Sequence, residues 1–163
     1  MQTCWSNQNN IHYSEIPLWT IFHGPDAFSK PSDKAAVAKG ATDFYVSRGI
    51  PEFYVNVLFI PVPTESFFNA AKPQFGHVPV EIFYTAENMD PNNHTLHTKL
   101  KDAFDEILEP HTTDKGHHLE YAVVDAAPYL SRINGIDLPE SFGPEEKEKA
   151  DEARAVLLAK HRS

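Results

Sequence analysis

The sequence predicts an α/β (α+β) domain in which two tandem β-α-β units form one four-stranded sheet with two helices on one face. Two observations lead to this prediction. Runs rich in β-branched and aromatic residues alternate with segments of helical periodicity, and the strand–helix–strand order occurs twice, starting at residues 18 and 78. Crossovers between parallel strands are almost always right-handed, so two such units side by side place both helices on the same face.

The first unit starts with a short apolar, β-prone run at residues 18–22 (LWTIF). A helix is predicted over 29–49, because Ser29 can cap it, Pro31 is tolerated in its first turn and a glycine stands at its end. The run 53–60 (FYVNVLFI) is almost continuously apolar, which is typical of a strand covered on both faces.

A proline-rich connection, 61–77, follows, and we expect a small hairpin near 67–68. The second unit then repeats the order with a strand at 78–85, a helix from Asn92 or Asn93 to about residue 109, and a strand at 119–126. The buried face of this second helix is predicted to consist of Leu96, Leu100, Ala103, Phe104, Ile107 and Leu108.

The other face of the predicted sheet is apolar and has no helix to cover it. Uncovered apolar faces mark interfaces, so we expect several subunits to associate. Residues 134–144 are rich in turn formers, and a charged helix with a weak apolar stripe is predicted from 144 to about 160. The chain therefore divides into an N-terminal extension (1–16), the main domain (17–139) and a C-terminal charged helical tail (140–163).

Composition argues against several classes of protein. The formal net charge of -9 disfavours nucleic-acid binding, which needs clustered Lys and Arg. Cys4 is the single cysteine, so an internal disulfide is impossible and a cysteine-based zinc site is not expected. The chain lacks a run of about 18 apolar residues, and residues 1–16 lack the basic and apolar regions of a secretory signal. We therefore expect a cytosolic protein without a membrane partner.

Pro17 opens the first predicted strand, and several separated segments match one family in the same order. These segments are 17–29 (PLWTIFHGPDAFS), 36–45 (AVAKGATDFY), 49–63 (GIPEFYVNVLFIPVP), 115–123 (KGHHLEYAV) and 133–139 (INGIDLP). On them the sequence resembles the tautomerase superfamily, and within it the cis-3-chloroacrylic acid dehalogenase-like branch, especially its fungal members. The resemblance covers most of residues 17–139.

This resemblance implies a chemistry and an assembly. Members of the superfamily carry a catalytic proline as the first residue of the mature chain, and its secondary amine acts as acid or base. They are usually trimers with active sites near the subunit interfaces. Their reactions include keto–enol tautomerisation, hydration and dehalogenation of small unsaturated acids, and decarboxylation. We accordingly expect a small-molecule substrate, a homotrimer and no cofactor.

Pro17 occupies the position of the catalytic proline. An apolar pocket disfavours the charged form of an amine and so lowers its pKa towards neutrality. In this sequence Ile16 precedes Pro17, and a proline nitrogen in a peptide bond is an amide without useful basicity. Catalysis through Pro17 requires cleavage between the two residues or a different start site. The alternative is that Pro17 only begins an edge strand, where a missing N–H is tolerated.

Two tyrosines are the other candidate catalytic residues. By resemblance, Tyr45 stands where bacterial dehalogenases of this branch have a substrate-binding histidine, and Tyr121 matches a tyrosine that helps to position the attacking water. Tyr45 lies on the apolar face of its predicted helix, so a purely structural role is its alternative. Neighbours on a strand point to opposite faces, so only one of Glu120 and Tyr121 can face a given pocket. Tyr121 is the better candidate, and Glu120 is a general base only if it is buried.

The candidate substrate-binding residues are His23, Phe83, Glu120 and Arg132. The dehalogenase branch holds its carboxylate substrate with two arginines after the third strand, but residues 83–93 contain no Arg or Lys. Arg132 falls near the place of a catalytic glutamate in those enzymes, which reverses the local charge. Both differences argue against 3-chloroacrylate dehalogenation. His23 follows the first strand and is expected either at the mouth of the pocket or in a turn.

Two histidine pairs, His94 with His97 and His117 with His118, are the remaining candidates for metal ligands. Ligands three residues apart on a helix are geometrically feasible. No carboxylate motif accompanies either pair, so we expect solvated or capping histidines and predict no metal site.

The predicted function is cofactor-independent acid–base chemistry, of the tautomerisation or hydration type, on a small carbonyl or enol compound. Pro17, Tyr45 and Tyr121 would carry it. The main alternative is a non-catalytic or repurposed oligomer or ligand-binding protein, because Pro17 is internal and the arginine pair is missing. A third hypothesis is an enzyme that has abandoned the proline and uses Tyr, His or Glu side chains in the same pocket.

Overall fold

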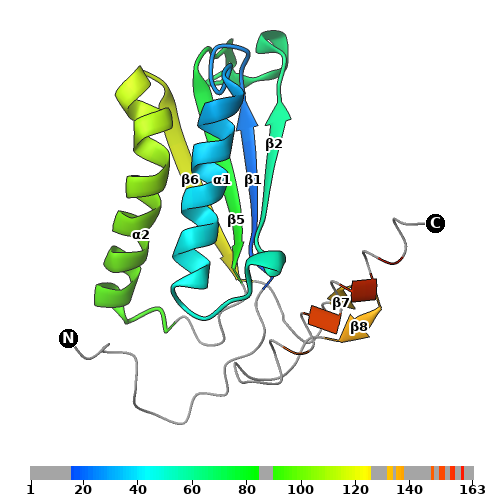
Figure 1. The fold of residues 1–163 in the computed structure, drawn as a ribbon. Coiled ribbons are helices and arrows are strands. Elements are labelled where there is room, and N and C mark those ends of the chain that lie inside the picture. The colour runs from blue at the N-terminus through cyan, green and yellow to red at the C-terminus, as the bar shows by residue number, and fades with distance from the viewer. Residues whose placement is uncertain are drawn as a thin grey trace.

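The computed structural model describes residues 16–84, 90–125, 132–133 and 135–137, together with the helical tail residues Glu148, Asp151, Glu152, Ala155, Val156 and Ala159. The main sheet consists of β1 (Leu18–His23), β2 (Asn56–Pro61), β5 (His77–Tyr84) and β6 (His118–Asp125), in the order β2-β1-β5-β6. Helices α1 (Pro31–Val46) and α2 (His94–Leu108) both lie on one side of it (Figure 1). The predicted pair of β-α-β units is confirmed.

Strand directions follow from the two crossovers. β1 and β2 are parallel, as are β5 and β6, because a helix joins the strands of each pair. β1 and β5 run antiparallel at the centre of the sheet, where Trp19 lies opposite Ile82. The beginning of β1 therefore lies beside the end of β5, and β2 and β6 form the two edges.

Helix α1 starts two residues later than predicted. Ser29 does not cap it, because the N-cap residue is Lys30, which makes no side-chain capping hydrogen bond. Pro31 lies in the first turn, where a backbone N–H would have no acceptor within the helix, so the absence of an N–H costs no hydrogen bond. Beyond the other end, Gly49 has a φ of 91°, a left-handed conformation that favours glycine after a helix. The predicted glycine stop is thus confirmed and the predicted cap is wrong.

Helix α2 closely follows its prediction. The side chain of Asn93 accepts a hydrogen bond from the backbone N–H of Leu96 at 3.1 Å, which satisfies one of the unpaired donors of the first turn. Leu100, Phe104 and Leu108 are buried, as the apolar periodicity predicted. The other predicted members of that face are partly buried: Leu96, Ala103 and Ile107.

Replacing the cap residue of α2 is expected to destabilise the domain. Asn93→Ala removes the acceptor for the Leu96 N–H and should lower the free energy of unfolding by about 1 kcal/mol. Asn93→Asp keeps an acceptor at the N-cap and should unfold close to the wild-type midpoint. Urea titrations of the three proteins measure the difference, and equal midpoints for Asn93→Ala and wild type would contradict the capping role.

Strand β2 differs from its predicted form. The apolar run 53–60 predicted a strand covered on both faces, but its first two residues belong to a 3-10 turn (Glu52–Tyr54) and the strand starts at Asn56. β2 is an edge strand with one face towards the core, and Leu58 on the other face is 49% exposed. Within the described part of the single chain the second face of β2 is therefore open, and a continuous apolar run does not reveal whether anything covers that face.

The core lies between the sheet and the two helices. Its largest fully buried side chains include Trp19, Tyr45, Tyr54, Phe104, Ile21 and Ile82. Trp19 from β1 and Phe104 from α2 meet edge to face, with ring centroids 5.2 Å apart, a favoured aromatic geometry. The indole of Trp19 therefore packs the centre of the sheet against the second helix.

The opposite face of the sheet has no described helix over it. Strand alternation and the pairing register place Leu18 and Phe83 on this open face, together with the exposed Leu58. Ionisable side chains lie on the same face. Thr20 is two residues from Leu18 and so shares its face, and Glu81 is paired with Thr20. His77 is four residues from Glu81 on β5 and therefore also points to the open face. The open face is therefore mixed in polarity, whereas the sequence predicted an apolar one.

Two short hairpins complete the described fold. They are β3 (Phe68–Asn69) with β4 (Lys72–Pro73), and β7 (Arg132–Ile133) with β8 (Ile136–Asp137). The first confirms the hairpin predicted near 67–68. The predicted tail helix at 144–160 falls largely outside the described residues, as does most of the extension 1–16. No described helix is long and apolar enough to cross a membrane.

Candidate active site

Pro17 is fully buried immediately before β1. Its carbonyl oxygen accepts a hydrogen bond from the backbone N–H of Asn56 at 2.9 Å, which joins it to β2. The antiparallel register pairs Leu18 with Phe83, so the next residue of β5, Tyr84, lies beside Pro17. Pro17 is thus held on both sides by neighbouring strands.

Aromatic side chains gather at this end of β1. Tyr45 from α1 is fully buried, and its hydroxyl oxygen accepts a hydrogen bond from Nε1 of Trp19 at 3.0 Å. The rings of Tyr45 and Tyr84 lie 5.8 Å apart between centroids. Alternation along β1 puts Pro17 on the same face as Trp19, facing the helices. The described side chains around Pro17 are mostly aromatic, and apolar surroundings lower the pKa of an amine.

Tyr121 lies elsewhere in the same chain. On β6 it is paired with Val80, which is in turn paired with Ile21 of β1. Ile21 is four residues from Pro17, or about 13 Å along the strand at roughly 3.3 Å per residue, and β6 is two strands away. The Pro17 and Tyr121 of one chain therefore do not meet at one site.

The hydroxyl of Tyr121 is engaged with α2. It donates to Oδ1 of Asp105 at 2.8 Å and lies 3.3 Å from the carbonyl oxygen of Lys101. Its ring meets Phe104 edge to face at 6.2 Å. Burial, followed by the hydrogen bond to the Asp105 carboxylate, raises the pKa of the Tyr121 hydroxyl above its usual value of about 10. Tyr121 is therefore a neutral hydrogen-bond donor at physiological pH.

The raised pKa of Tyr121 predicts a loss of stability at high pH. Above about pH 10 the unfolded tyrosine releases its proton while the folded one keeps it, so the native state binds more protons and stability falls as pH rises. The stabilisation is fully present below pH 10. Tyr121→Phe should remove this contribution, which is at most about 1.4 kcal/mol per pH unit for one proton. Denaturant titrations between about pH 9 and 11.5 measure it, and identical pH slopes for the two proteins would contradict the assignment.

His23 and a surface pocket lie at the opposite end of β1. Six residues at roughly 3.3 Å each put His23 about 20 Å from Pro17. Its ring is buried, and Nδ1 lies 2.9 Å from the carbonyl oxygen of Gly24. The sequence placed His23 after the first strand, but it is the last residue of β1. The pocket is lined by Phe22, His23, Gly24, Pro25, Asp26, Val62, Pro63, Thr64, Phe67, Gln74, Phe75, Gly76, His77 and Pro79. His23 thus lines a pocket, but not one at Pro17.

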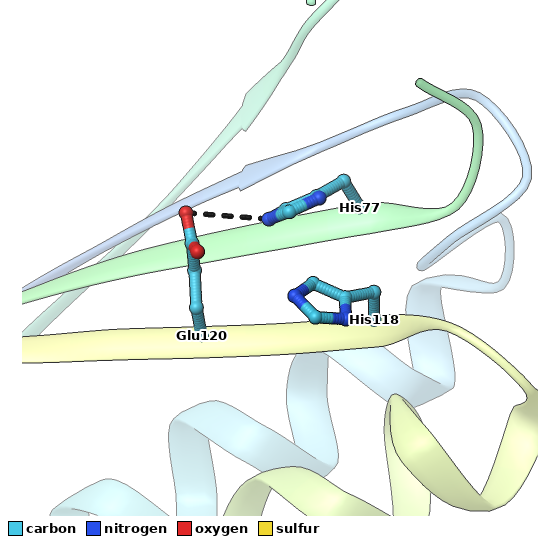
Figure 2. A group of neighbouring side chains, drawn as sticks. All are labelled: His77, His118 and Glu120. Carbon is cyan, nitrogen blue, oxygen red and sulfur yellow. Dashed lines mark ion pairs between the residues drawn. The ribbon is translucent and has the colours of Figure 1, made fainter. Parts of the chain in front are cut away.

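The other candidate residues are distributed over the surface. Phe83 is half-buried on the open face, next to Leu18. Glu120 is exposed on β6, with Oε1 3.2 Å from Nε2 of His77 (Figure 2). Arg132 is exposed on β7, in a ribbon separate from the main sheet.

Comparison with known proteins identifies the family. A family model described as "Putative oxalocrotonate tautomerase enzyme" matches residues 16–154. The chain belongs to the tautomerase superfamily. No curated protein matches it in sequence.

Solved structures support the same membership. A protein from the thermophilic fungus Aspergillus fumigatus is 30% identical, with a TM-score of 0.76 over 86% of this tautomerase-superfamily chain and 96% of its own. The RhCC protein of Rhodococcus jostii RHA1 is 27% identical, with a TM-score of 0.74 over 83% and 96% of the two chains. A symmetric trimer of fused 4-OT has the same fold, with 17% identity and a TM-score of 0.58 over 74% and 94%. The resemblance to the superfamily is confirmed, and the dehalogenase-like branch stays a prediction.

Within this tautomerase fold, two of the predicted site residues lie close together, and the others lie apart from them. Pro17 and Tyr45 are brought to the same end of the sheet, with Trp19 and Tyr84 around them. The sequence analysis did not single out these last two residues as site residues. Alternation from Pro17 places Trp19 on the proline's face, so Trp19 could have been found; Tyr84 required the register between β1 and β5.

Proposed function

We propose that the protein is a cofactor-independent enzyme of the tautomerase type, acting through the amine of Pro17 in a form of the chain that begins at that residue. The observation that carries the proposal is the position of Pro17. It is fully buried at the start of β1, beside Tyr84, at the end of the sheet where Tyr45 and Trp19 are hydrogen-bonded. Family membership supports the same conclusion.

The chemistry follows from the environment of the amine. With Ile16 removed, the nitrogen of Pro17 has a lone pair, and apolar surroundings favour its neutral form. The neutral amine takes a proton from the carbon next to the substrate's carbonyl group, which gives an enolate, and the protonated amine then delivers that proton to the enolate oxygen, which gives the enol. The same two steps in reverse convert the enol to the keto form. Tyr45 is our candidate to donate a hydrogen bond to the carbonyl oxygen.

The proposed substrate is a small carbonyl or enol compound that is uncharged or weakly acidic. Carboxylates are usually bound by Arg, and residues 83–93, which include the end of β5 and the segment after it, contain neither Arg nor Lys. Glu87 and Asp90 in that segment would repel a carboxylate. This charge pattern supports a substrate other than 3-chloroacrylate.

Keto–enol conversion of acetylacetone, an uncharged and weakly acidic 1,3-diketone, tests the proposal. A chain prepared to begin at Pro17 should catalyse the conversion. Pro17→Ala in this shortened chain should lower the rate by about 100-fold or more, as loss of a general acid–base group typically does. Far-UV circular dichroism shows whether both chains are folded. If both are folded and inert, or if the variant retains the full rate, the proposal is wrong.

We also propose that the protein forms a homotrimer through the open face of the sheet. Leu58 and Val124 are large apolar side chains exposed on the edge strands β2 and β6, and the fused 4-OT relative is a trimer. Burial of apolar surface is the usual source of stability for such an interface. Sedimentation equilibrium at micromolar concentration should give three times the chain mass, and a stable monomer would overturn the trimer.

A further inference from the structure

Three side chains on the open face of the sheet converge at the start of β5 and β6. His77 is the first residue of β5, and His118 and Glu120 belong to β6 (Figure 2). One nitrogen or oxygen atom from each residue lies within 4.8 Å of the other two. Two imidazoles and one carboxylate are a ligand set that proteins use for divalent transition metals.

The pairing register of the parallel strands produces this convergence. His77 lies directly opposite His118, and Glu120 lies opposite Pro79. Residues two apart on a strand point to the same face, so His118 and Glu120 both project from the side of the sheet that carries His77. The backbone therefore fixes three potential ligands on one face without a dedicated loop.

One buried nitrogen of the cluster, Nε2 of His77, lacks a hydrogen bond to any described residue. The side chain of His77 is only 5% exposed, and its Nε2 lies 3.2 Å from Oε1 of Glu120. Even so, among the described residues this buried nitrogen makes no hydrogen bond of acceptable geometry. A buried imidazole nitrogen without a hydrogen bond is costly, and a metal ion on its lone pair removes that cost.

The distances agree with a shared ion. Zinc binds imidazole nitrogen and carboxylate oxygen at about 2.0–2.2 Å in a tetrahedral arrangement, so two ligand atoms of one ion are roughly 3.3 Å apart. The His77–Glu120 separation of 3.2 Å matches this spacing. His118 is exposed and its ring lies 4.3 Å from that of His77 between centroids, so side-chain rotation alone brings its nitrogen into range.

We propose that His77, His118 and Glu120 bind a divalent transition metal ion, with Zn²⁺ the best match to two imidazoles and one carboxylate. Three protein ligands leave a coordination position for water or another donor. His77 is seven residues from Tyr84, so the ion lies about 23 Å along β5 from the level of Pro17. The metal site and the proposed proline chemistry are therefore independent, and each can fail without the other.

Metal titration of the full chain tests this proposal. Co²⁺ is the spectroscopic probe, because visible absorption bands report nitrogen and oxygen ligation, and Zn²⁺ affinity is measured by calorimetry. Wild type should bind a single ion at this site per chain. His118→Ala and Glu120→Gln should each weaken binding by at least about tenfold, since even loss of a group that only orients a ligand costs roughly 10–100-fold. Both side chains are exposed in the single chain, so the variants should fold, and sedimentation equilibrium shows whether each keeps the wild-type assembly state.

A double variant, His94→Ala with His97→Ala, is the matched control. These two histidines lie three residues apart on α2 with ring centroids 6.3 Å apart, outside the cluster. The control should retain wild-type affinity and Co²⁺ absorption. Absence of binding by the wild type, unchanged affinity in His118→Ala and Glu120→Gln, or loss of binding in the control would each overturn the proposal.

Discussion

A chain that begins at Ile16 should catalyse the keto–enol conversion of acetylacetone about 100- to 10,000-fold more slowly than a chain that begins at Pro17, the range for loss of a general acid–base group. The two proteins differ by one residue and one peptide bond. In the longer chain the nitrogen of Pro17 is an amide, whose lone pair is delocalised and cannot accept a proton. The shorter chain has a secondary amine at the same place in the fold, immediately before β1. Initial rates at equal concentration measure the difference.

Thermal unfolding of the two chains provides the control. The backbone hydrogen bond from Asn56 to the Pro17 carbonyl oxygen does not involve the proline nitrogen, so both chains should fold alike. Equal rates from the two folded proteins would show that Pro17 is not the acid–base group. That outcome would favour an enzyme that uses tyrosine, histidine or glutamate side chains. Intact-mass spectrometry on protein from its natural source would show which start residue occurs in the cell.

Phe104→Ala should lower the free energy of unfolding by about 3–5 kcal/mol. Phe104 is fully buried on α2, and its ring contacts Trp19 of β1, Phe44 of α1 and Tyr121 of β6. Removing it leaves a cavity where the sheet meets both helices. Because these neighbours come from separate elements fixed by the sheet and by the other helix, they cannot easily collapse into the space.

An exposed phenylalanine provides the comparison for this substitution. Phe75 is 72% exposed, so Phe75→Ala should change the free energy of unfolding by no more than about 0.5 kcal/mol. Urea titrations of both variants measure the difference. A loss of less than about 1 kcal/mol for Phe104→Ala would mean that the core between sheet and helices is less tightly packed than its aromatic contacts indicate.

Most local features of the fold could be predicted because their causes are local, although the predicted cap of α1 at Ser29 is wrong. The apolar spacing of α2 predicted the burial of Leu100, Phe104 and Leu108. The N-cap is Asn93, one of the two residues, Asn92 and Asn93, at which the helix was predicted to begin. Features decided by distant contacts were predicted less well. The apolar run 53–60 correctly indicated a strand, but its position at the edge of the sheet depends on the order of strands from both units.

The candidate site shows the same division. The resemblance to the tautomerase superfamily pointed to Pro17 and Tyr45, which the structure brings to one end of β1. No sequence pattern pointed to His77, because its contact with Glu120 depends on the register between β5 and β6. Alternation correctly separated Glu120 from Tyr121, but only the structure shows that Tyr121 is the one that faces α2.

The hydrogen bond between Trp19 and Tyr45 makes the candidate site directly observable by fluorescence. The sequence contains two tryptophans, Trp5 and Trp19, and only Trp19 remains in a chain that begins at Pro17. All tryptophan emission from that chain then arises from an indole that is fully buried and hydrogen-bonded to Tyr45, at the end of the sheet where Pro17 lies. Ligand entry beside the proline, or a shift of α1 against the sheet, would change the wavelength or intensity of a single emitter, without any added label.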